Sequence, residues 1–204
     1  MVNRKYLCGN IGRASCDIPV GEDYVPGFTD TQNYWAAHYV DYLYAAGITT
    51  GYDDGTFRPD RNITRQQFAV MLFRYLGLQE SDYEGLSLPF ADNAQIADYA
   101  RTAVKALYSL GVIGGTEKNG KLYFDPSGSL TRAQAAAMIG RTQEKGYDEV
   151  ELTFTDASAI PAYAAPYIRT MAAQGVIGGY TDGTFKPASN ITRGQMAKIL
   201  FNLR

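Results

Sequence analysis

The sequence predicts an all-α protein built from three helix–loop–helix repeats that share one hydrophobic core. Internal repetition is the first observation, because the tripeptides at residues 28–30, 90–92 and 154–156 all read Phe-x-Asp. The second is that apolar residues within each unit recur every three to four positions, which is typical of a helix with one buried face. A helical pair of roughly fifty residues buries too little apolar surface alone, so the units are expected to pack together.

The repeats divide the chain into an upstream segment and three units. We expect an N-terminal tail over residues 1–27, unit one over 28–89, unit two over 90–153 and unit three over 154–204, each of the first two ending in a polar linker. The tail contains Cys8 and Cys16, the only cysteines, which could form a disulfide or remain free thiols. It lacks the apolar stretch of a signal peptide.

The first helix of unit one is predicted over about Trp35–Ala46, where apolar residues keep a three-to-four spacing. Gly47 followed by Ile48 predicts its end, since glycine takes the left-handed C′ conformation and the next apolar residue packs back on the helix. The same stop signal recurs at Gly111 and Gly175. Pro166 lies early in the first helix of unit three, so this helix should begin late or bend.

The second helix of each unit is predicted to begin after a capping box of the form Thr-Arg-x-Gln. In this motif the threonine oxygen accepts from the backbone N–H three residues on, and the glutamine reaches back to the threonine N–H. Each threonine cap should contribute about 1 kcal/mol. The three boxes are Thr64 to Gln67, Thr131 to Gln134 and Thr192 to Gln195.

The loop between the two helices contains an Asp-Gly-Thr turn in units one and three. Glycine supplies the positive φ, and the aspartate bonds its own backbone. A calcium loop is a poor interpretation, because further oxygen ligands and a closing glutamate are missing. In unit two the loop is three residues longer between Gly115 and Pro126 and has no such turn.

An arginine follows the capping threonine in every unit, where a cation opposes the positive end of the helix dipole. Beside free N–H groups at a helix start, its planar fork would form a site for a carboxylate or phosphate. The alternative is an ion pair with the aspartate of the Phe-x-Asp tripeptides. The arginines are Arg65, Arg132 and Arg193, and the aspartates are Asp30, Asp92 and Asp156.

Aromatic and glycine residues complete the set of candidate ligand-binding residues. Twelve positions before the helix-ending glycines lie Trp35, Tyr99 and Tyr163, which could belong to the core or stack on a sugar face. Tyr52 and Tyr180 in the loops are further candidates for ligand contact. The glycines beside them would let a ligand approach the backbone closely, and they are Gly51, Gly115 and Gly179.

Composition and motifs exclude several other functions. A net charge of −2 and a pI near 5.4 argue against a nucleic-acid partner. No apolar run is long enough for membrane insertion. With His38 as the only histidine, His-based zinc chemistry and a Ser–His relay are not expected, the sequence has no Cys/His ligand set, and we expect no cofactor. The repeated aspartates lack the second carboxylate that a glycosidase needs, so catalysis is not expected.

These motifs together resemble the surface-layer homology (SLH) domain family over about residues 28–204. The resemblance rests on Phe-x-Asp, Trp35-Ala36, Gly-Tyr-x-Asp-Gly-Thr-Phe-x-Pro, and the Ile/Leu-Thr-Arg triplets that begin at Ile63, Leu130 and Ile191. It implies a three-lobed, pseudo-threefold helical domain in which the second helices are central. It also implies a monomeric module of a larger protein on the outside of a bacterial cell.

For function, the resemblance implies non-covalent anchoring to the wall. Family members usually bind pyruvylated secondary cell wall polysaccharide in grooves between lobes, and the pyruvate ketal is a carboxylate of the kind that the arginines would bind. Similar domains in some two-membraned bacteria bind modified peptidoglycan, which is the alternative partner here. A glycan hydrolase is a third and disfavoured interpretation.

The sequence departs from the family pattern at three places. The usual glutamate of the capping box is glutamine in every unit, which still caps the helix but removes a charge. Unit two has the longer loop and places Asp125 before its proline, where the other units have Arg58 and Lys186. Unit one has Thr50 where the others have a second glycine. We therefore predict three unequal grooves.

Overall fold

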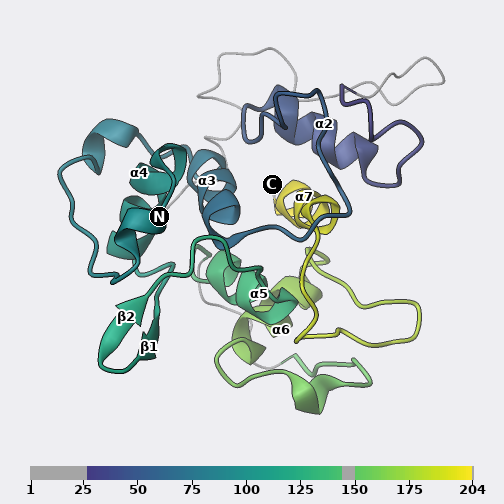
Figure 1. The fold of residues 1–204 in the computed structure, drawn as a ribbon. Helices are drawn as coiled ribbons and strands as arrows, with labels where there is room; N and C mark the ends of the chain where they lie inside the picture. The colour runs from purple at the N-terminus through teal and green to yellow at the C-terminus, as the bar shows by residue number, and fades with distance from the viewer. Residues whose placement is uncertain (1–26, 144–149, 204) are drawn as a thin grey trace.

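The structure, a computed structural model, describes residues 27–143 and 150–203 of the chain. The alternatives for Cys8 and Cys16 lie outside the described residues. Six α-helices are the main regular elements of the described part, with short 3-10 turns at Glu80–Asp82, Asn93–Gln95 and Ala157–Ala159 (Figure 1). The first helices of the units are α2 (Ala37–Ala45), α4 (Asp98–Ser109) and α6 (Ala165–Ala173), and the second helices are α3 (Arg65–Tyr75), α5 (Arg132–Gly140) and α7 (Arg193–Asn202). The predicted all-α class is confirmed.

The only sheet in the described part of the chain is a two-stranded hairpin in unit two. Strand β1 (Thr116–Lys118) pairs antiparallel with β2 (Lys121–Tyr123). The hairpin occupies the loop that the sequence showed to be longer in this unit. None of the helices in the described ranges is long and apolar enough to traverse a bilayer.

The helices pair between units rather than within them. Helix α3 packs on α4, α5 packs on α6, and α7 packs on α2, so the second helix of each unit lies against the first helix of the next (Figure 1). The last pair joins the end of the described chain to its beginning and closes a ring of three lobes. Each lobe therefore needs residues from two repeats.

A ring of backbone hydrogen bonds joins the three units at the centre. The Ile63 N–H donates to the Ile191 carbonyl at 3.1 Å, the Ile191 N–H to the Leu130 carbonyl at 2.9 Å, and the Leu130 N–H to the Ile63 carbonyl at 3.3 Å. All three side chains are fully buried. The residues that precede the three capping threonines thus form the axis of a pseudo-threefold arrangement.

The predicted helix ends are confirmed where the chain forms them locally. All three capping boxes are present, with the threonine oxygen and the glutamine side chain each making its bond. Gly47 has a φ of 73°, and the Ile48 N–H donates to the Leu43 carbonyl at 2.8 Å, which completes the predicted stop signal. Helix α6 begins only at Ala165 with Pro166 in its first turn, as expected. Helix α2 begins at Ala37 rather than Trp35.

Candidate functional site

The three aspartates of the Phe-x-Asp tripeptides hold the loops of their own units. The Asp30 carboxylate accepts from the backbone N–H groups of Phe57 at 2.8 Å and Arg58 at 2.7 Å. Asp92 and Asp156 make the equivalent pairs of bonds in units two and three. The alternative of an ion pair with the capping-box arginines is not found among the described residues, whose ion pairs join other side chains. The aspartates position the loops.

The bonds to Asp156 make part of the stability depend on pH. Desolvation alone would raise the pKa of Asp156, but the N–H groups of Phe185 and Lys186 lower it below its ordinary value of 3.8. Because the folded state favours the carboxylate, its contribution is complete above about pH 4 and is lost as the pH falls further. We expect Asp156→Asn to lower the free energy of unfolding by about 1–3 kcal/mol at pH 7 and to flatten its decline below pH 4. Urea unfolding at several pH values measures both, and an unchanged pH slope in the variant would contradict the assignment.

Each capping-box arginine extends from its own unit into the loop of the next. Arg65 Nε donates to the Phe124 carbonyl at 2.6 Å and Nη2 to the Gly114 carbonyl at 3.0 Å. Arg132 makes the matching bonds to Phe185 at 2.8 Å and Gly178 at 3.0 Å. The arginines therefore lie at the three junctions between units.

Arg193 differs because the only hydrogen bond that its side chain makes to the described residues runs from Nε to the Phe57 carbonyl, at 2.8 Å. Neither of its Nη atoms has an acceptor in the described part of the chain, whereas Arg65 and Arg132 each use Nη2. Arg193 is only 5% exposed, and burial lowers its pKa. The guanidinium nevertheless stays protonated at neutral pH. It is a buried cation with two uncommitted pairs of donors.

The backbone N–H groups at the helix starts are not free, which corrects the expectation of a helix N-terminal anion site. In α7 the Arg193 N–H donates to the Arg61 carbonyl at 2.9 Å and the Gly194 N–H to the Pro59 carbonyl at 2.8 Å. The third N–H, of Gln195, donates to the Thr192 hydroxyl at 3.2 Å. Helices α3 and α5 use the same scheme. Anion recognition at these junctions would depend on side chains.

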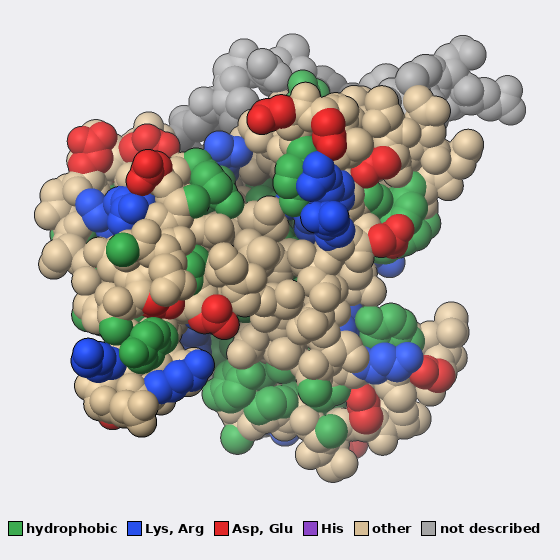
Figure 2. All heavy atoms as spheres, in the orientation of Figure 1, with side chains coloured by type: hydrophobic (Ala, Val, Ile, Leu, Met, Phe, Trp, Pro, Cys, Tyr) green, Lys and Arg blue, Asp and Glu red, His purple; other side chains and the backbone are tan. Residues whose placement is uncertain are grey.

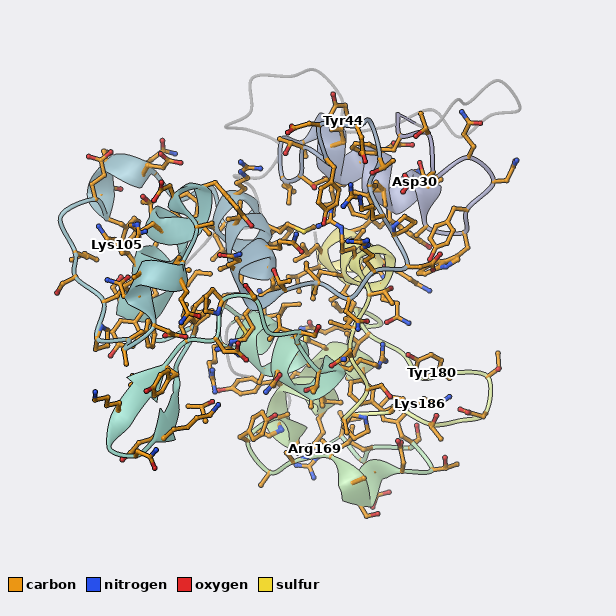
Figure 3. The ribbon with its side chains drawn as sticks, viewed as in Figure 1. Asp30, Tyr44, Lys105, Arg169, Tyr180 and Lys186 are labelled. Carbon is orange, nitrogen blue, oxygen red and sulfur yellow. The ribbon has the colours of Figure 1, made fainter. Side chains whose placement is uncertain are left out.

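The loops of units one and three each place a tyrosine ring close to two cations. The Tyr52 ring centroid lies 4.9 Å from Arg193 Cζ and 3.9 Å from Arg58 Cζ. The Tyr180 ring lies 4.9 Å from Arg132 Cζ and 4.4 Å from Lys186 Nζ, and Figure 3 shows Tyr180 and Lys186 on one loop. These distances fit cation–π interactions.

The predicted Asp-Gly-Thr turn holds the loop cation over the tyrosine. Asp54 accepts from the Thr56 N–H at 3.1 Å and lies 2.8 Å from Arg58 Nη2. The hydroxyl of Thr56 and the guanidinium of Arg58 lower the pKa of Asp54 to about 2. In unit three Asp182 binds Thr184 and Lys186 in the same way. The turn is confirmed in both units.

The three aromatic residues near the first-helix starts are exposed and do not belong to the core, so the core interpretation is wrong. Trp35, Tyr99 and Tyr163 are 54%, 61% and 48% exposed. Tyr99, from unit two, interacts electrostatically with Tyr52 of unit one and Arg193 of unit three. The side chains of Tyr52, Tyr99 and Arg193, with Phe57, form what we call the Arg193 site. It draws on all three repeats.

The candidate glycines are required by packing within the protein, because a side chain at these positions would clash with neighbouring atoms. A Cβ at Gly51 would lie 2.1 Å from the Phe28 ring, and Gly51 has a φ of 70°. A Cβ at Gly115 would lie 2.5 Å from Leu122, and one at Gly179 would lie 2.8 Å from the Thr184 carbonyl. Open space is found instead at Gly114 and Gly178, whose carbonyls bind arginines. Sequence reasoning missed these two, although the Gly-Gly pairs were visible.

The third junction, around Arg65, has a different composition. The loop of unit two forms the β-hairpin and has no tyrosine equivalent to Tyr52. Burial lowers the pKa of Arg65, and the carboxylates of Asp125 and Asp92 partly offset this. Compared with the Arg193 site, the Arg65 site therefore carries more negative charge and offers one fewer aromatic ring.

The face of the molecule shown in Figure 2 has no continuous basic area. Acidic and basic side chains are interspersed on the face shown in Figure 2. The same view shows a hollow between the lobe that carries α2 and the loop that carries Tyr180 and Lys186.

Comparison with known proteins identifies the repeats. Residues 27–69, 89–136 and 153–197 match the S-layer homology domain. The chain is 34% identical over 174 residues to an endoglucanase of Bacillus sp. strain KSM-635, which covers 83% of this chain and 18% of that protein. It is 32% identical to a cellulosome-anchoring protein of Acetivibrio thermocellus over 76% of this chain and 35% of that protein.

A third relative is S-layer protein EA1 of Bacillus anthracis, 31% identical over 63% of this chain and 14% of that protein. The chain thus spans at most about a third of the length of these relatives. The similarity to the enzyme lies in the SLH region, and SLH domains are typical of cell-surface and S-layer proteins. With three matched segments in three structurally equivalent units, the chain belongs to the S-layer homology domain family.

Proposed function

We propose that this chain is a non-catalytic anchoring module that binds an acidic, pyruvylated secondary cell wall polysaccharide at the junctions between its repeats. The Arg193 site is the observation that carries the proposal. It places a buried guanidinium with two unpaired Nη groups beside the Tyr52 ring and the exposed Tyr99.

The geometry suits a sugar that carries a carboxylate. Two Nη groups of one guanidinium donate in parallel, which matches the two oxygens of a carboxylate and strengthens both bonds. An exposed tyrosine can lie against the apolar face of a sugar ring while its hydroxyl stays in water. A pyruvate ketal places a carboxylate directly on such a ring.

The relatives support anchoring rather than a reaction. A module of this kind occurs in an endoglucanase, a cellulosome-anchoring protein and an S-layer protein. Because these proteins have such different roles, a shared location at the cell surface explains the common module better than a shared chemical reaction does. We extend that location to the protein that contains this chain.

The proposal predicts binding that depends on the pyruvyl groups. The parent chain should sediment with purified cell walls, and removal of the pyruvyl groups should reduce the bound fraction by at least tenfold, because linked sites on a polymer add about 10²–10⁴ in avidity. Walls mock-treated in the same way are the control.

Two outcomes would overturn the proposal. Undiminished binding after the polysaccharide is removed would assign the module to peptidoglycan. Release of reducing ends from wall glycan by the purified chain would show that it is catalytic.

A further inference from the structure

The glutamines of the capping boxes do more than cap their helices in units one and three. Gln67 Nε2 donates to the Tyr52 hydroxyl oxygen at 3.0 Å, and Gln195 Nε2 donates to the Tyr180 hydroxyl oxygen at 3.1 Å. Gln134 of unit two has no such partner in the described residues, because the hairpin replaces the tyrosine. Only two of the three boxes are thus connected to a loop aromatic.

The orientation of each glutamine amide follows from its cap. The Thr64 backbone N–H donates to Gln67 Oε1 at 3.3 Å, and the Thr192 N–H donates to Gln195 Oε1 at 3.2 Å. An N–H group requires an oxygen opposite it, so the Nε2 group of each amide must face the tyrosine. The tyrosine oxygen is therefore an acceptor in this bond.

The hydroxyl proton of each tyrosine then remains available. In the described part of the chain, the only hydrogen bond found at the hydroxyl of Tyr52 or Tyr180 is the one that it accepts from glutamine. Tyr52 is half-buried beside Arg193, and Tyr180 is half-buried beside Arg132. At both junctions the tyrosine O–H is a donor that still requires an acceptor, as are both Nη groups of Arg193 and the Nη1 group of Arg132.

We infer that Gln67 and Gln195 are positioning residues that turn Tyr52 and Tyr180 into hydrogen-bond donors toward the carboxylate of the ligand. This inference rests on the proposed function and adds a specificity rule to it. Two junctions offer donors alone and select an anionic acceptor, whereas the Arg65 site lacks the tyrosine donor. A glutamate at either position would reverse the bond, because its carboxylate would accept the tyrosine proton.

The test is the double variant Gln67→Glu/Gln195→Glu, with Gln134→Glu as the matched control. All three substitutions keep the capping box, and a negative charge near a helix start is favourable, so melting temperatures should not fall. Binding is measured on immobilised wall polysaccharide that carries pyruvate ketals. We expect at least a tenfold loss for the double variant, since a hydrogen bond to a charged acceptor is worth about a decade in affinity, and less than a twofold change for the control.

A double-mutant cycle separates proton donation from simple charge repulsion. In a Tyr52→Phe/Tyr180→Phe background no hydroxyl remains to redirect, so the two glutamates should cause no further loss. An equal additional loss in that background would show repulsion and overturn the inference, as would parental binding by the double glutamate variant. Failure of the parent to bind the polysaccharide would instead overturn the proposed function.

Discussion

Replacement of Arg193 by lysine should weaken binding to pyruvylated wall polysaccharide about 10- to 100-fold, the range expected when charge-assisted hydrogen bonds to a carboxylate are lost. Lysine keeps the positive charge but cannot present two parallel donors. Both Nη groups of Arg193 lack an acceptor in the described structure, whereas Arg65 has already committed Nη2 to the Gly114 carbonyl. The effect should therefore be concentrated at the Arg193 site.

Arg65→Lys is the matched control for this prediction. Each substitution removes the bond from Nε to a phenylalanine carbonyl of the next unit, and Arg65→Lys also removes the Nη2 bond to Gly114, so the structural cost of the control is at least as large. We expect the control to lower binding less than threefold, because Arg65 has already committed Nη2 to the Gly114 carbonyl and the negative charge of Asp125 acts on the same guanidinium. Equal losses in the two variants would mean that the junction bond, and not the ligand, causes the effect. Melting temperatures of both variants complete the comparison.

Leu130→Ala should have the largest effect on stability, lowering the free energy of unfolding by about 2–5 kcal/mol. Leu130 is fully buried and its backbone belongs to the ring that joins the three units. The cavity would therefore lie where all three repeats meet. We also expect a single cooperative transition in urea, because each lobe is made from two repeats.

Leu110→Ala provides the control for core packing. Leu110 is 50% exposed at the end of α4, so its truncation should change the free energy of unfolding by no more than about 0.5 kcal/mol. Equal effects of the two substitutions, or three separate unfolding transitions, would contradict a shared core.

Local features of the fold could be predicted with their residues. The capping box at Thr64 and Gln67 depends on bonds that span three positions, and the stop at Gly47 depends on a conformation that glycine adopts at little cost. The Asp-Gly-Thr turn is equally local. Each of these elements has the same partners in the structure as in the prediction, because residues close in sequence meet whatever the rest of the chain does.

The candidate site could be predicted only as a set of residues. The arginines were identified from their unfavourable position at the helix starts, but their carbonyl partners belong to the next unit and no local pattern points to them. Spacing alone also placed Trp35 in the buried stripe of a helix, whereas α2 begins two residues later and leaves the ring exposed. The sequence did not predict the bond between Gln67 and Tyr52, because helix capping already explained the presence of the glutamine.

The sequence by itself determined three repeats, their helix ends, their turns and the family, since each follows from short-range geometry repeated at fixed offsets. Only the tertiary structure decided which helices pair and which groups remain free to bind. Arg193 and Phe57 are 136 positions apart, and their contact exists because burial of the Ile63, Leu130 and Ile191 side chains closes the three units into a ring. Because hydrophobic burial is not directional, the repeat pattern allows the helices to pair within a unit or between units. The ring of backbone hydrogen bonds favours pairing between units.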